Sequence, residues 1–335
     1  MTVNETLALY SNYLVYGAMA AFTVSMIAFA ASFAAMRTNE DLPAESVPTD
    51  AEAGAPGAGG VAVATKVATG GPSDGSDDAL PPGRRAGNIG MSTMWLGTIL
   101  LGLGVLLRGL AVSRAPWGNM CEFAMTSAFV LALIFVVFSL KRDVRWLGIF
   151  VSTSVLLVLG LAMTVFYTEA AQLVPALKSY WLIIHVSAAM ICGAAFCIGA
   201  TFTVLFLIAD TGERRRSEDR GYWLAGFAKR LPAAAKLDSM AYRTNAFLFP
   251  LWTFAIIAGA VWAENAWGRY WGWDPKETWA FITWVAYAAY LHARATAGWK
   301  GRKAAYIALV AFACFVFNFV GINILVSGLH SYGGV

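Results

Sequence analysis

The run WLGIFVSTSVLLVLGLAMTVFY, residues 146–167, decides the kind of fold, because it is long and carries no charged side chain. A helix rises about 1.5 Å per residue, so about 20 apolar residues cross the roughly 30 Å hydrocarbon core of a bilayer. Working outward, the sequence contains eight such apolar runs, at residues 7–36, 89–107, 120–140, 146–167, 181–209, 244–263, 278–297 and 304–329. We therefore predict an all-α fold, a polytopic integral membrane helical bundle with about eight transmembrane helices.

The composition of the whole chain agrees with this prediction. Of the 335 residues, 59% are hydrophobic and 13% are charged, and the mean hydropathy is +0.61. Average soluble domains are about 45–50% apolar and about 25% charged. The composition therefore excludes an ordinary soluble domain.

The cationic residues predict which side of the membrane each loop occupies, because cytoplasmic loops carry an excess of Lys and Arg. Of the 24 Lys and Arg residues, 19 fall in one set of alternate loops and five in the other, namely Arg108, Arg114, Lys178, Arg269 and Lys276. We therefore predict that both termini and residues 267–274 lie on the extracytoplasmic side of the plasma membrane. The net charge of +4 follows from this topology and does not indicate a nucleic-acid partner.

Composition also divides the chain into parts. Residues 1–37 predict an N-terminal transmembrane helix, which we expect to be retained, since it has neither the basic start nor the small-residue exit of a signal peptide. Residues 38–88 are rich in Ala, Gly, Pro, Ser and Asp, which predicts a disordered cytoplasmic linker. Residues 89–335 would form the main bundle. Within it, residues 210–243 set apolar side chains among basic ones, which predicts an amphipathic helix on the anionic inner leaflet.

The four cysteines lie within or at the edge of predicted spans, and none forms a CxxC pair. They are Cys121, Cys192, Cys197 and Cys314. This spacing indicates neither thiol redox chemistry nor a zinc site. We expect these side chains to serve as small apolar groups at helix contacts.

The segment WAENAWGRYWGWDPKETW, residues 262–279, is the most informative connection between two spans. Its aromatic residues are Trp262, Trp267, Tyr270, Trp271, Trp273 and Trp279, and glycines stand at Gly268 and Gly272. An aromatic belt at headgroup depth would explain one or two of these rings. The density of rings and the interspersed glycines favour a stacking platform for a planar hydrophobic ligand such as a porphyrin.

The charged residues of this segment have two interpretations. Asp274, Pro275 and Glu277 match an N-cap, a first-turn proline and the N3 residue of a capping box, which predicts the start of a helix. Arg269 and Lys276 are cations on a side that is otherwise poor in them, so they are candidates to bind carboxylates such as haem propionates. The alternative for both cations is contact with headgroup phosphates.

The sequence has three histidines, and two of them flank the tryptophan segment. His185 lies near the predicted outer end of its helix, and His330 follows the last span. Imidazole is a common iron ligand, so two histidines on opposite sides of a platform would supply both axial positions of a haem. His292 lies near the cytoplasmic end of its span, where a functional role and a hydrogen bond to a neighbouring helix are both open.

Residues 267–279 resemble the WWD signature of haem-handling proteins, and residues 89–335 are similar to the CcsA/ResC branch of c-type cytochrome biogenesis. The segment 118–123, GNMCEF, together with His185 and the ending at His330, fits the same branch. The resemblance implies haem b as cofactor, carried across the membrane and presented for thioether attachment to the CxxCH motif of an apocytochrome c. It implies a holocytochrome c synthase that works with a ResB/CcsB-type membrane protein, and it allows for a thiol-reducing thioredoxin-like protein.

The resemblance also implies roles for individual residues. His185 and His330 would ligate the external haem iron, and His292 would serve an inner site completed by the partner. The reaction site would consist of these two external histidines with Trp271, Trp273 and Asp274. The haem-binding set adds Trp262, Trp267, Gly268, Arg269, Tyr270, Gly272, Lys276, Trp279 and Glu122.

Two other functions share some of these features. A haem exporter or chaperone of the CcmC or CcmF type uses the same loop, but His292 and about eight spans argue against CcmC, and a length of 335 residues argues against full-size CcmF. A secondary transporter for a non-haem solute would usually show repeat symmetry, which this sequence does not display.

Overall fold

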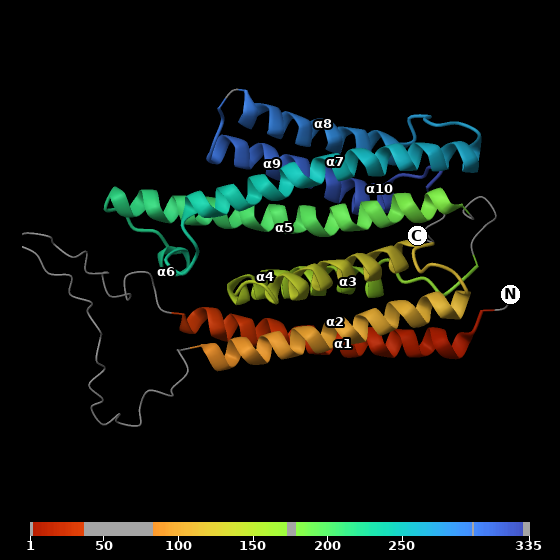
Figure 1. Cartoon of the computed structure of the whole chain (residues 1–335), viewed down its shortest axis with the longest axis horizontal. Helices are drawn as coiled ribbons and strands as arrows, with labels where there is room; N and C mark the ends of the chain where they lie inside the picture. Colours follow the sequence, from red (N-terminus) through yellow and green to blue (C-terminus); the bar gives the residue numbers. More distant parts are fainter. Residues whose placement is uncertain (1–2, 37–82, 173–178, 297, 331–335) are drawn as a thin grey trace, which may run out of the picture.

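The computed structural model describes residues 3–36, 83–172, 179–296 and 298–330, and the chain is helical within these ranges (Figure 1). Seven helices of the described part are long and apolar enough to cross a membrane. They are α1 (Glu5–Ala35), α2 (Arg84–Val112), α3 (Met120–Ser139), α4 (Arg145–Thr164), α5 (Tyr180–Ser217), α7 (Ala234–Trp267) and the stretch Arg302–Leu325. That last stretch comprises α9 (Arg302–Val316), the π-helical turn η2 (Phe317–Gly321) and α10 (Ile322–Leu325). The chain is a multi-pass membrane protein, and the predicted polytopic helical bundle is confirmed.

The predicted span at residues 278–297 forms helix α8 (Pro275–Ala295), but α8 is not apolar enough to count with these seven. Charged or ionisable side chains occupy both ends of α8, and its buried face carries Thr283, Tyr287 and Tyr290 instead of aliphatic residues. Helix α8 nevertheless runs alongside α7 and α9 (Figure 1). All eight predicted runs are helical, and α8 differs from the other seven in being less apolar, not in being too short.

Helices α1 to α4 form one part of the bundle, in which α1 lies along α2 (Figure 1). Two serines join these helices inside the bilayer region. The Ser11 hydroxyl donates to the Gly104 carbonyl at 2.7 Å, and the Ser25 hydroxyl donates to the Gly90 carbonyl at 2.8 Å. Small residues allow close helix approach in membranes, and polar side chains then bond across the interface.

Helices α5 and α7 to α10 form the other part. Its core contains Phe196 of α5, whose ring stacks on Tyr287 of α8 with centroids 4.2 Å apart. Helix α7 contains Pro250 in its interior. The turn η2 interrupts the last span with an i→i+5 pattern, which is rare in proteins and common near functional sites. This turn carries Asn318 and Phe319 toward the cavity described below.

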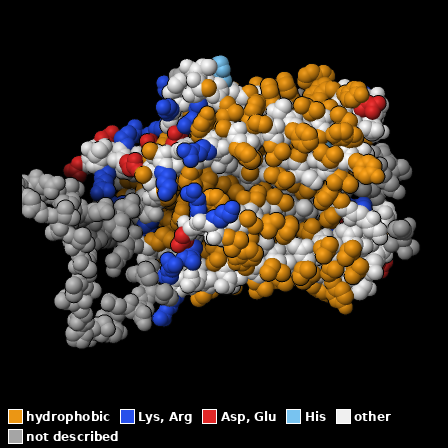
Figure 2. All heavy atoms as spheres, in the orientation of Figure 1, with side chains coloured by type: hydrophobic (Ala, Val, Ile, Leu, Met, Phe, Trp, Pro, Cys, Tyr) orange, Lys and Arg blue, Asp and Glu red, His pale blue; other side chains and the backbone are white. Residues whose placement is uncertain are grey.

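The two ends of the bundle differ in charge. Lys and Arg side chains gather at one end of the molecule, and an apolar surface covers most of the rest (Figure 2). The connection between α7 and α8 lies at the opposite end, which is also the end where α1 starts and α2 ends (Figure 1). The backbone N–H of Asn4 donates to the Ala111 carbonyl there, at 2.9 Å. The structure thus has the charge asymmetry on which the predicted orientation depends.

The prediction of an amphipathic surface helix at residues 210–243 is wrong. Helix α5 continues to Ser217, α6 spans only Ala225–Ala228, and α7 begins at Ala234. The left-handed backbone at Asp219 (φ 52°) and the proline at Pro232 break the helix. The apolar side chains of this stretch were predicted to face lipid, but not all of them are exposed. Phe227 packs against Phe33 and Phe150, and Leu231 is buried, whereas Trp223 is 88% exposed.

Most of the predicted linker, residues 38–82 of 38–88, lies outside the described residues. Its last residues, 84–88, are helical because α2 begins at Arg84. All four cysteines are free, with Cys121 and Cys192 buried and Cys197 and Cys314 partly buried, which agrees with a packing role.

Candidate functional site

A cavity lies at the end of the bundle opposite the gathered Lys and Arg side chains. Its walls come from segments far apart in the sequence. Helix α5 contributes His185, helix α7 contributes Trp262, and the last described residue, His330, closes one side. The other sequence-predicted residues that line it are Trp267, Tyr270, Trp271 and Lys276. The walls are predominantly apolar and aromatic with a few polar groups, which is typical of sites for planar hydrophobic ligands.

His185 is fixed by helix α7. Its Nδ1 is 2.7 Å from the Ala255 carbonyl oxygen, so Nδ1 carries the proton and Nε2 is the nitrogen available to a ligand in the neutral ring. The imidazole stacks with Trp262, with centroids 6.2 Å apart and planes 6° from parallel. Gly259 makes this approach feasible, because a Cβ there would lie 2.7 Å from the His185 ring.

His330 is fixed by the tryptophan loop. Its Nδ1 is 2.7 Å from Oδ2 of Asp274. Its ring meets the edges of Trp262 and Trp267, with centroids 5.8 Å and 5.0 Å apart. Trp262 is fully buried, and its ring contacts both imidazoles. Both outer histidines therefore contact the tryptophans, while their joint ligation of one haem stays a prediction.

Asp274 joins the loop to the C-terminal segment. It caps α8 in a complete capping box with Glu277, as the sequence predicted, and accepts a hydrogen bond from Lys276 N–H at 3.3 Å. It also accepts one from Leu329 N–H at 2.7 Å, beside the contact with His330. Burial by itself raises the pKa of Asp274, but the hydrogen bonds from His330, Leu329 and Lys276 outweigh burial and lower this pKa to about 2. The carboxylate is therefore charged at neutral pH and orients the imidazole.

Glu277 organises the loop from inside. It accepts hydrogen bonds from Gly272 N–H at 2.8 Å and Asp274 N–H at 3.1 Å, and it forms an ion pair with Arg269 at 3.2 Å. The Arg269 guanidinium covers Gly272 so closely that a Cβ at this glycine would lie 1.9 Å from Arg269 Cζ. Gly272 is thus required by packing within the loop. Gly268 ends α7 in the left-handed region, with φ 69°.

The two predicted cations differ in position. Arg269 is engaged by Glu277 and lies over Trp267, with its Cζ 5.8 Å from the ring centroid, and it is outside the described cavity lining. Lys276 lines the cavity, where its ammonium donates to Asn323 Oδ1 at 2.7 Å. Of the two, Lys276 is the better placed to meet a carboxylate of a bound ligand.

Two of the remaining aromatic residues of the loop are exposed to solvent. Tyr270 is 61% exposed and Trp273 is 66% exposed. Trp273 has φ 59°, a left-handed conformation that is costly for a bulky residue and common at functional sites. Trp271 and Trp273 meet edge to face with centroids 5.6 Å apart. Trp279 points elsewhere and packs on Phe317, with centroids 4.3 Å apart.

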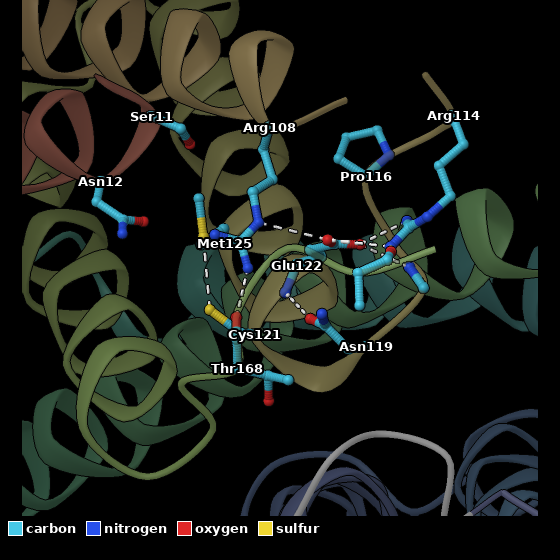
Figure 3. A network of polar contacts seen from close by, with 12 residues as sticks. Ser11, Asn12, Arg108, Arg114, Pro116, Asn119, Cys121, Glu122, Met125 and Thr168 are labelled. Carbon is cyan, nitrogen blue, oxygen red and sulfur yellow. Dashed lines mark hydrogen bonds and ion pairs between the residues drawn. The ribbon is translucent and has the colours of Figure 1, made fainter. Parts of the chain in front are cut away.

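Two more predicted site residues, outside the tryptophan loop, do not line the cavity. Glu122 is fully buried in an ion network with Arg108 and Arg114 (Figure 3). His292 is exposed on the last turn of α8, far along the helix from Asp274.

Several cavity residues were absent from the predicted set. They are Trp117 from the connection between α2 and α3, Met120 and Phe123 from the first turns of α3, and Asn318 and Phe319 from η2. The segment GNMCEF at 118–123 was noticed, but nothing in its spacing shows that it lies against the tryptophan loop. Gly259 was missed because its role depends on a helix contact across 74 residues of sequence.

The comparisons with known proteins agree with this architecture. Residues 117–330 match the sequence model of the Cytochrome C assembly protein family. The chain is 38% identical over 248 residues to the cytochrome c biogenesis protein CcsA of Guillardia theta, covering 70% of this chain and 81% of that protein. It is 34% identical over 300 residues to the protein of the same name from Picosynechococcus sp., covering 74% of this chain and 89% of that protein.

A solved structure named Cytochrome c Heme Lyase CcmF has a similar fold. The TM-score is 0.58 at 14% sequence identity, and the alignment covers 95% of this chain and 47% of that chain. The present chain spans about half of that structure, and at this identity the likeness concerns the fold alone. The family match and the CcsA relatives together cover most of the sequence, and the chain therefore belongs to the cytochrome c assembly protein family, as a protein of the CcsA type.

Proposed function

We propose that this protein acts in cytochrome c biogenesis, holding haem between His185 and His330 for covalent attachment to apocytochrome c. The observation that carries the proposal is the position of the two imidazoles. They border one aromatic cavity, both contact Trp262, and each directs its Nδ1 to a protein acceptor. Histidines that ligate metals usually donate their second nitrogen in this way, which fixes the tautomer and the ring orientation.

The residues of the cavity fit haem chemically. His185 and His330 would hold the haem iron, since imidazole nitrogens are common iron ligands. The lining supplies large aromatic faces in Trp262, Trp267 and Trp271, and Lys276 supplies a cation for a propionate. Arg269 would have to give up its ion pair with Glu277 before it could bind a propionate. We therefore propose Lys276 as the residue that binds the propionate.

The chemistry of attachment comes from the bound group and its substrate: the haem vinyls accept the two thiols of a CxxCH motif as thioethers. The chain's own residues would bind, orient and shield. Asp274 keeps His330 in the tautomer that presents Nε2, and Ala255 does the same for His185. Trp273 and Tyr270, exposed at the rim, would form the surface that meets the apocytochrome. The four free cysteines need no part in this reaction, because the substrate supplies both sulfurs.

The proposal includes a membrane partner of the CcsB/ResB type. His292 is exposed at the basic end of α8, on a helix whose outer face mixes polar and apolar side chains. An imidazole on such a surface can meet a second histidine only from another polypeptide. We therefore propose that His292 belongs to an inner haem site shared with the partner, through which haem b reaches the outer cavity.

We further propose that the basic end faces the cytoplasm and that the cavity opens on the extracytoplasmic side of the plasma membrane. The gathering of Lys and Arg at one end supports this orientation, since cytoplasmic ends are enriched in these residues (Figure 2). On that side, haem and apocytochrome would meet outside the cytoplasm.

The test is reconstitution in a host that lacks its own cytochrome c maturation system. The chain is coexpressed with a CcsB-type partner and an apocytochrome c, and covalent haem is measured by haem staining of a denaturing gel. We expect stained cytochrome with the wild-type chain and a large loss with Trp271→Ala. Equal staining without the chain would contradict the proposed function.

A further inference from the structure

The connection between α2 and α3 separates two hollows. Trp117 lines the site cavity on one side, together with Gly118, Asn119 and Met120. Trp117 also lines a second, apolar hollow between α2, α3 and α5, which includes Leu106, Phe129 and Met190. The indole of Trp117 is therefore shared by both hollows. Whatever holds this connection in place also shapes one wall of the site.

One buried carboxylate holds the connection on both sides of Trp117. Glu122 Oε2 accepts from Arg114 Nη1 at 2.7 Å and from Gly118 N–H at 2.9 Å. Arg114 precedes Trp117 and Gly118 follows it, so a single carboxylate spans the tryptophan. Figure 3 shows the two guanidinium groups approaching Glu122 from different elements.

The other contacts tie this carboxylate to the rest of the bundle. Arg108 of α2 reaches Glu122 Oε1 at 3.4 Å and also donates to the Thr168 carbonyl beyond α4. Arg114 donates to the Ala171 carbonyl at 2.7 Å. The side chains of Glu122 and Arg108 are 0% and 1% exposed, and that of Arg114 is 12% exposed. A network of buried charges with several fixed partners is rigid, because moving one side chain leaves the other buried charges without partners.

The network acts at a distance from the ligand. Arg108, Arg114 and Glu122 are not among the described residues that line the site cavity. Thr126 further restrains the same connection by donating to the Pro116 carbonyl at 3.1 Å. Of the two residues that flank Trp117, Pro116 is therefore held by Thr126 of α3 and Gly118 is held by Glu122.

We propose that Glu122, with Arg108 and Arg114, is a positioning residue that clamps the 114–118 connection and keeps Trp117 in the wall of the haem cavity. The haem part of this inference rests on the function proposed above. The clamp itself does not, because it concerns the order of a loop that can be measured without haem.

The experiment uses the full-length chain in lipid nanodiscs and two readouts. Hydrogen exchange, followed by mass spectrometry on peptides covering residues 113–123, reports the order of the connection. Titration with haem reports affinity. The variants are Glu122→Gln, Trp117→Ala and their combination, and Asp238→Asn is the matched control, since Asp238 forms an ion pair with Arg294 at 2.7 Å at the basic end.

We expect Glu122→Gln to accelerate exchange in the 113–123 peptides by about tenfold, because a buried N–H loses its charged acceptor. Exchange in peptides covering the loop 266–278 should stay as in the wild type. Glu122→Gln and Trp117→Ala should each raise the haem Kd by about tenfold, and the double variant should lose no more than either single one. This lack of additivity is the mark of two residues acting through one element. Asp238→Asn should leave haem affinity and the 113–123 peptides unchanged.

Unchanged exchange in the 113–123 peptides of Glu122→Gln would overturn the clamp. Faster exchange with wild-type haem affinity in both single variants would overturn the positioning role. Additive losses in the double variant would show that Glu122 acts independently of Trp117 and would also overturn it. Should Glu122→Gln fail to fold, Arg114→Lys, which keeps the charge but loses the two-pronged contact, takes its place in the same comparison. If the wild-type chain binds no haem, the proposed function fails, and the exchange data still decide whether Glu122 holds the connection.

Discussion

Replacing Asp274 with Asn tests how the loop holds His330. The carboxylate accepts three hydrogen bonds, from His330 Nδ1 and Lys276 N–H at Oδ2 and from Leu329 N–H at Oδ1. Asparagine has one oxygen, so its amide nitrogen must face at least one of these donors. Because Asn caps helices as well as Asp does, α8 should still begin at residue 275. The variant therefore isolates the contact between the loop and the C-terminal segment.

The magnitude follows from the buried donors. Asp274 is 7% exposed, and leaving one buried donor unsatisfied costs about 1–3 kcal/mol. Without this contact His330 is no longer held in place before haem binds, so binding must itself order the imidazole, and each ~1.4 kcal/mol of that cost weakens binding about tenfold. We predict that Asp274→Asn weakens haem binding by roughly tenfold or more. Asp274→Asn should also lower the Tm, and Asp274→Ala should lower both the affinity and the Tm further, because the N-cap is lost as well.

The assay is haem titration of the purified chain followed by absorption, with thermal unfolding measured on the same samples. Asp143→Asn is the matched control, because Asp143 also stands before a helix and pairs with Arg145 at 3.0 Å, but at the basic end. The control should bind haem as the wild type does. A Kd for Asp274→Asn within twofold of the wild-type value, with an unchanged spectrum, would refute the role given to Asp274.

Three further predictions use other parts of the structure. The pKa of Asp274 is lowered from 3.8 to about 2, so the stability that its charged carboxylate contributes is complete above about pH 4 and is lost as the pH falls toward 2. The Tm difference between wild type and Asp274→Asn should therefore shrink between pH 4 and pH 2, and a constant difference would contradict this. His292→Ala should leave the haem content of the isolated chain unchanged and should remove one haem from the complex with a CcsB-type partner, measured by haem stoichiometry, whereas an unchanged stoichiometry in the complex would argue against a shared inner site. In a background without the four native cysteines, Glu169→Cys should react with a membrane-impermeant thiol reagent in intact cells and Trp223→Cys should not; the reverse pattern would place the cavity in the cytoplasm.

The transmembrane part of the fold could be predicted because long apolar runs have few alternatives in a bilayer. The runs that became α1 to α4 were located within five residues, whereas α5 continues past its predicted run to Ser217 and α7 begins well before its run, at Ala234. Stretches with mixed composition were harder to interpret. Residues 210–243 satisfied an amphipathic pattern, but Phe227 found partners on α1 and α4, and the fold used its apolar surface inside the molecule. One face of helix α8 packs on α7 and α9, so this helix forms with fewer apolar residues than an isolated span would need.

The candidate site was predictable to the extent that its chemistry is local in the sequence. The capping box at Asp274 and the aromatic loop follow from residues 262–279 alone. The proximity of His185 and His330 to that loop could be expected only from the order of the spans. The contacts between Gly259 and His185, and between Glu122 and Arg108, depend on which helix faces which, and periodicity does not encode that choice. Glu122 was therefore placed in the haem-binding set, although its contacts are with arginines.

Coordination of the haem iron by His185 and His330 together is the central claim, and resonance Raman spectroscopy of the haem-loaded chain tests it most directly. We predict a six-coordinate, low-spin iron in the wild type. His185→Gly and His330→Gly should each give a five-coordinate spectrum, and added imidazole should restore the six-coordinate form in both. Six-coordinate, low-spin spectra in both variants without imidazole would contradict the claim.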